Sequence, residues 1–229
     1  MLREIVKSRK PHSANTLLAM GNPKLEARTV SRSKNVLMSP SLEPLPDAER
    51  MVKELGLIYG TKASKVYVGA EAREEVLKAE SRNYRTLQLA THGVVNNASP
   101  MYSYVVLAQS DDAKEDGFLE AWEIMQLDLN AELAVLSACD TARGRIGAGE
   151  GVIGLAWALF VAGCPTTVVS QWKVESSSTT ELMLSFHRNL QSGSGKSEAM
   201  RQASMKLMLD KRYNHPFYWA GFIVVGDPQ

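Results

Sequence analysis

Short apolar runs alternate with longer helical patterns along almost the whole chain, and this alternation constrains the fold more than any other feature. Apolar runs closed by glycine, proline or polar residues predict strands, and the stretches between them predict helices, the first capped by Asp47. This alternation favours a mainly parallel sheet with helices on both faces. Strands are expected at 16–20, 66–69, 86–91, 104–108, 131–138, 166–170 and 219–225, and helices at 48–55, 72–81, 118–125, 150–162, 179–191 and 197–210.

Composition narrows the function classes. The 229 residues carry 26 Lys and Arg against 25 Asp and Glu, a formal net charge of +1, so no long-range field favours nucleic acid or an acidic membrane as partner. The longest apolar run, near 155–164, is too short to span a bilayer. Two cysteines make no disulfide framework and no signal peptide opens the chain, which indicates a reduced, cytoplasmic setting. Scattered histidines and two distant cysteines predict no metal site.

Two chemically competent residues directly follow apolar strands. His92 ends the strand at 86–91 and Cys139 ends the strand at 131–138, 47 residues later (139 − 92). Ligands and catalytic groups gather at the carboxyl ends of parallel strands. A cysteine nucleophile needs such a base, and the N–H groups of Gly93 and Cys139 could hold an oxyanion. Taken singly, a strand-end cysteine is more often a buried apolar residue, and a strand-end histidine a structural one.

Several motifs in order resemble the CHAT family, caspase- and separase-related domains often found behind tetratricopeptide repeats. They are 90–93 (ATHG), 136–144 (LSACDTARG), 149–151 (GEG), 170–174 (SQWKV) and 219–228 (WAGFIVVGDP). The resemblance implies a caspase-like three-layer α/β/α sandwich with a mostly parallel six-stranded sheet. It also implies a cysteine endopeptidase that needs no cofactor, with Cys139 and His92 as the catalytic dyad. The family commonly has Glu where Asp140 stands and Pro where Lys173 stands, and the dyad is intact.

The resemblance further implies that a peptide substrate adds as a strand beside Ser170, Gln171 and Trp172, with main-chain hydrogen bonds providing affinity. Trp172 would then form a pocket wall, and core packing is an equal alternative. Asp140 and Glu150 suggest a preference for Arg or Lys before the scissile bond. Alternatively, Asp140 hydrogen-bonds its turn and Glu150 caps the next helix.

Other interpretations and boundaries complete the expectations. A regulatory or scaffold module that keeps the caspase-like fold without proteolysis is the main alternative, and activity is expected to depend on a tetratricopeptide-repeat region or a regulatory protein. An esterase is discounted, because Gly193-Ser194-Gly195 lies between predicted helices and lacks the nucleophile-elbow spacing. Residues 1–14 are expected to be a linker or the tail of an upstream region, which would make the chain a fragment of a longer protein. Residues 15–229 are expected to form the CHAT domain.

Overall fold

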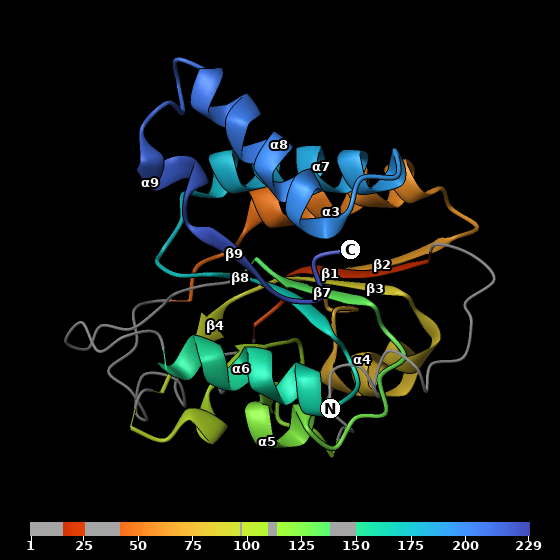
Figure 1. The fold of residues 1–229 in the computed structure, drawn as a ribbon. Helices are drawn as coiled ribbons and strands as arrows, with labels where there is room; N and C mark the ends of the chain where they lie inside the picture. Colours follow the sequence, from red (N-terminus) through yellow and green to blue (C-terminus); the bar gives the residue numbers. More distant parts are fainter. Residues whose placement is uncertain (1–15, 26–41, 97, 110–113, 138–149) are drawn as a thin grey trace.

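A six-stranded sheet runs through the centre of the protein, with helices on both faces (Figure 1). The computed structural model describes residues 16–25, 42–96, 98–109, 114–137 and 150–229, the side chains of 150–153 excepted. Neighbouring strands are parallel except β8 and β9, which are antiparallel, so the predicted three-layer α/β sandwich with a mostly parallel sheet is confirmed. In spatial order, the strands are β2 (Ser64–Gly69), β1 (Leu17–Pro23), β3 (Thr86–Ala90), β7 (Leu133–Leu136), β8 (Thr166–Ser170) and β9 (Phe222–Gly226).

The central strands are buried on both faces, as strands of a parallel sheet require. Leu17 of β1 packs with the helices of one face, whereas its neighbour Leu18 packs with those of the other. One face carries α3, α7, α8 and α9, and the other carries α4, α5 and α6 (Figure 1). Their bounds are α3 (Pro46–Tyr59), α4 (Glu74–Glu80), α5 (Ala121–Ile124), α6 (Glu150–Val161), α7 (Ser176–Gln191), α8 (Lys196–Leu209) and α9 (Pro216–Trp219), with 3-10 turns η1 (Ser81–Asn83) and η2 (Pro100–Tyr102).

Helix α3 lies unusually close to β1 because of a glycine. A Cβ added at Gly21 would lie 2.7 Å from a methyl group of Val52 and 2.9 Å from the carbonyl oxygen of Ala48. The helix begins at Pro46 with Leu45 as its N-cap, so the expectation that Asp47 caps it is wrong, and Asp47 lies in its first turn. Proline suits the first helical position because it has no N–H to leave unsatisfied there.

A second, three-stranded antiparallel sheet adjoins the first and was not predicted. It consists of β4 (Gly93–Val94), β5 (Tyr104–Val106) and β6 (Phe118–Glu120). The predicted strand at 104–108 therefore belongs here and not to the central sheet. The predicted helix at 118–125 is wrong over its first three residues, because Phe118 and Leu119 pair with β5 and only 121–124 are helical.

Among the described residues, no helix combines the length and the apolar character needed to cross a membrane.

Candidate active site

The strands predicted to carry the two catalytic residues are neighbours in the sheet. Strand β3 pairs in parallel with β7 from Thr86↔Leu133 to Leu89↔Leu136. Every pair along this ladder is offset by 47 residues (136 − 89), which is the separation of His92 and Cys139 in the sequence. The amide of Ser137 continues the ladder beyond β7, donating to the Leu89 carbonyl at 3.0 Å. The carboxyl ends of β3, β7 and β8 thus share one edge of the sheet.

The ring of His92 is held in one orientation by the main chain. Its side chain follows β3 and is 9% exposed, and its Nε2 lies 2.7 Å from the carbonyl oxygen of Glu43. A carbonyl oxygen only accepts hydrogen bonds, so Nε2 carries a proton and donates it. In the neutral ring, Nδ1 is then the basic nitrogen.

Glu43 is a site residue that the sequence did not reveal. It contributes a main-chain oxygen from the segment just before α3, and any residue type except one that distorts the backbone could supply that atom. No side-chain motif therefore marks the position.

The main-chain N–H of Gly93 points away from β5. The amide of Val106 donates to the His92 carbonyl at 2.7 Å, which makes His92 and Val106 a hydrogen-bonded pair. Hydrogen-bonded and non-hydrogen-bonded pairs alternate along an antiparallel ladder, so Gly93, opposite Val105, belongs to the second kind. Its N–H consequently points outward from the small sheet, and no Cβ stands beside it.

Three predicted site residues cannot be placed. Cys139 and Asp140 lie outside the described residues. Glu150 is the first residue of α6, as the expected helix start required, but its side chain is also outside the described part. Their roles stay predictions.

The predicted peptide-binding segment lies at the end of β8. Ser170 is buried and pairs with Phe222, and the amide of Gln171 donates to the Gly221 carbonyl at 2.7 Å. The half-buried indole of Trp172 packs on Gly221, where an added Cβ would lie 3.2 Å from the ring, and its Nε1 donates to the Phe217 carbonyl at 3.2 Å. The residue therefore has packing contacts and an accessible side, so both interpretations of Trp172 stay open.

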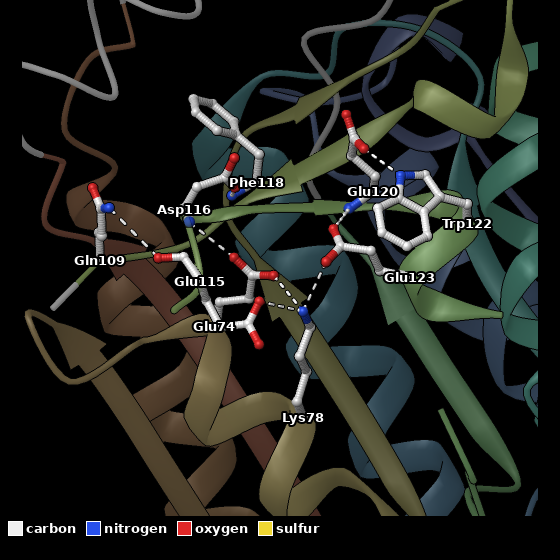
Figure 2. A network of polar contacts seen from close by, with 10 residues as sticks. Glu74, Lys78, Gln109, Glu115, Asp116, Phe118, Glu120, Trp122 and Glu123 are labelled. Atoms are coloured by element: carbon white, nitrogen blue, oxygen red, sulfur yellow. Dashed lines mark hydrogen bonds and ion pairs between the residues drawn. The ribbon is translucent and has the colours of Figure 1, made fainter. Parts of the chain in front are cut away.

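A cluster of three carboxylates surrounds one ammonium on the opposite side of the sheet from α3 (Figure 2). Lys78 Nζ lies 2.8 Å from Glu74, 2.5 Å from Glu115 and 2.8 Å from Glu123. Oxygens of the three carboxylates lie within 4.8 Å of one another, a spacing that suits a metal ion, but the Lys78 ammonium already supplies the positive charge there. We interpret the cluster as an internal ion-pair network.

This network supports the sheet that carries Gly93. Glu74 and Lys78 come from α4, Glu115 precedes β6, and Glu123 belongs to α5. The second oxygen of Glu74 accepts from the amide of Gly117 at 2.8 Å, directly before β6. Burial raises the pKa of Glu74 to about 7, against the opposing effect of Lys78. Burial lowers the pKa of Lys78, but the carboxylates outweigh it and raise that pKa above its usual value.

The described architecture, an α/β sandwich built on a mostly parallel six-stranded sheet, is that of a caspase-like sandwich. Comparison with known families is more specific. The sequence pattern of the CHAT domain matches residues 1–227, and the chain belongs to the CHAT domain family.

Two curated relatives carry repeats in their names. Tetratricopeptide repeat protein 28 of mouse and tetratricopeptide repeat protein 28 of human are each 24% identical to this chain over 253 aligned positions. The alignment covers 96% of this chain, which spans only 10% of the length of each relative. The family resemblance seen in the sequence, including its association with tetratricopeptide repeats, is confirmed.

Proposed function

We propose that this chain is a cysteine endopeptidase with Cys139 as nucleophile and His92 as its catalytic partner. The observation that carries the proposal is the constant offset of 47 residues between β3 and β7. The last described pair of that ladder, Leu89↔Leu136, stands three residues before His92 on one strand and three residues before Cys139 on the other. Two residues chosen from the sequence for their chemistry therefore follow neighbouring parallel strands at one edge of the sheet.

The orientation of His92 supports its role as the base. Because Nε2 donates to Glu43, Nδ1 is the nitrogen that would accept the thiol proton. When the ring becomes an imidazolium, the Glu43 carbonyl still accepts from Nε2 and stabilises the added charge.

The proposed reaction proceeds through an acyl-enzyme. The Cys139 thiolate attacks the scissile carbonyl carbon, and the N–H groups of Gly93 and Cys139 stabilise the resulting oxyanion. The tetrahedral intermediate collapses as His92 gives its proton to the leaving amine, which leaves a thioester on sulfur. Water, deprotonated by His92, then attacks the thioester and releases the carboxylate and the free thiol.

The substrate is proposed to lie beside the end of β8. The amide of Gln171 is already bonded to Gly221, so a peptide strand would pair with main-chain groups of this segment other than that N–H. A preference for Arg or Lys before the scissile bond would require the carboxylates of Asp140 and Glu150 to face the peptide. We further propose a cytoplasmic location. We also propose control by a tetratricopeptide-repeat region or a regulatory protein, and the first of these is supported by the repeats in the names of the relatives.

Hydrolysis of fluorogenic peptides varied at the residue before the scissile bond tests the proposal. We expect turnover by the wild type and a loss of at least about a thousandfold in Cys139→Ala and in His92→Ala. Cys164→Ala is the matched control, because that thiol is buried and donates to the Thr166 carbonyl at 3.2 Å. Equal rates for Arg and Asp reporters would remove the basic preference. Cleavage that survives Cys139→Ala would contradict the mechanism, and silence even with the repeat region supplied would favour the scaffold alternative.

A further inference from the structure

A network of hydrogen bonds, buried at Gln88, His187 and Tyr59 and half-buried at Ser137, links β3 and β7 to α7 and α3. Gln88 is fully buried in the middle of β3, between Leu87 and Leu89, where an apolar residue would be expected. Its Nε2 donates to the Ser137 hydroxyl at 2.7 Å, and its Oε1 lies 3.0 Å from Nε2 of His187 on α7. Nδ1 of the same histidine lies 3.0 Å from the Tyr59 hydroxyl on α3.

The donors and acceptors of this hydrogen-bond network are consistent with one arrangement. The Gln88 amide nitrogen donates to Ser137, so its oxygen accepts from His187 Nε2, and His187 Nδ1 accepts from the Tyr59 hydroxyl. The Ser137 hydroxyl in turn donates to the Leu89 carbonyl at 3.4 Å. This pattern requires a neutral His187, and burial lowers the pKa of that ring to about 3.

The network joins the two strands close to their catalytic ends. Gln88 lies four residues before His92, and Ser137 lies two residues before Cys139. The Ser137 hydroxyl approaches the same Leu89 carbonyl that its own amide binds, so β3 and β7 are joined there by side chain and main chain together. A buried polar network is costly unless every member is satisfied, and one that is satisfied fixes a single geometry.

We propose that Gln88 and Ser137 are positioning residues that fix the distance and register between His92 and Cys139. The inference rests on the proposed peptidase dyad. Neither residue touches the substrate. Each sets where its strand ends relative to the other, and small displacements of catalytic groups reduce rates strongly.

Two substitutions of equal shape at position 137 test this role. Ser137→Thr keeps the hydroxyl, whereas Ser137→Val replaces it with a methyl group. The readout is the rate at which iodoacetamide alkylates Cys139 in the intact, folded protein, measured as a function of pH. After digestion, mass spectrometry of the peptide that contains Cys139 gives the alkylated fraction. We expect Ser137→Val to lower the rate at pH 7 about tenfold and to shift the reactivity profile to higher pH, while Ser137→Thr stays close to the wild type. Peptide turnover should lose kcat with little change in KM.

Further variants separate positioning from general stability. Gln88→Leu should resemble Ser137→Val, whereas Tyr59→Phe removes a buried bond at the far end of the network and should leave Cys139 reactivity near wild type. Equal reactivity of Ser137→Val and Ser137→Thr would overturn the inference, as would an equal loss in Tyr59→Phe. His92→Ala distinguishes the two proposals: if it slows alkylation while Ser137→Val does not, the dyad stands and positioning is wrong, and if it changes nothing, both are wrong.

Discussion

Single residues fix the path of the main chain at the end of the sheet. Gly226 closes β9 with a φ of 110°, in the left-handed region that favours glycine, and pairs with Thr166 at the start of β8. A Cβ added there would overlap the carbonyl oxygen of Pro165, which already accepts from the Asp227 amide at 3.1 Å. Position 226 therefore excludes a side chain for reasons of both conformation and space.

We expect Gly226→Ala to lower the free energy of unfolding by at least about 2 kcal/mol, because main chain must move to relieve the overlap. Gly193→Ala is the control, since Gly193 also has a positive φ of 91° but no atom of the described residues lies within 4 Å of an added Cβ. That change should cost only about 1 kcal/mol. Urea unfolding of both variants measures the difference, and equal losses would mean that the contact with Pro165 does not matter.

Residues of the proposed site differ in how well the sequence reveals them. His92 and Gly93 follow an apolar strand and stand in a family motif, so both could be selected before the fold was known. The Glu43 carbonyl could not, because a main-chain oxygen leaves no trace in residue type. Gln88 was also missed: a polar residue inside an apolar strand is informative only when its distant partners, Ser137 and His187, are known.

At the scale of elements, Lys78 ties α4 to the segment before β6 and to α5 (Figure 2). Its side chain is 22% exposed, and the Glu74 side chain only 1%. Lys78→Met should lower the free energy of unfolding by roughly 2 to 4 kcal/mol, because three carboxylates would lose their shared cation. Lys53→Met is the control: that lysine is 57% exposed and, among the described residues, pairs with Glu49 on its own helix, so about 0.5 kcal/mol is expected. Thermal unfolding at pH 8 compares them, and similar losses would contradict a structural role for the network.

Elements of the central sheet were predictable because their pattern is local, whereas in the small sheet only β5 was predicted as a strand. Strands β3, β7 and β8 are continuous buried runs bounded by polar residues. By contrast, β6 has three residues and continues directly into α5, with Glu120 and Glu123 forming a capping box between them. Its strand conformation depends on pairing with β5, a segment elsewhere in the chain. This pairing overrides the local helical pattern, which is all that the sequence at 118–120 reveals.

Over the whole molecule, two buried ionisable groups on opposite faces of the sheet act against each other as pH changes. Glu74 lies on the α4 face and His187 on the α7 face (Figure 1). The pKa of Glu74 is raised from 4.5 to about 7, so the folded state holds an extra proton and its contribution to stability is lost as pH rises from about 4.5 to 7. The pKa of His187 is lowered from 6.5 to about 3, so the unfolded state holds the extra proton and stability is lost as pH falls from about 6.5 to 3.

Between pH 4.5 and 6.5 these two contributions to the free energy of unfolding have slopes of opposite sign, so each offsets the other. Glu74→Gln removes the contribution that falls with pH. We therefore expect the free energy of unfolding of this variant to rise with pH across this window, relative to that of the wild type. His187→Gln, which keeps a donor for Gln88, should instead make stability fall with pH. Urea unfolding at half-unit pH steps measures all three profiles, and profiles that stay parallel would show that neither group titrates differently in the folded protein. Because the two groups have different partners in the described part of the chain, the double variant should return to the wild-type slope.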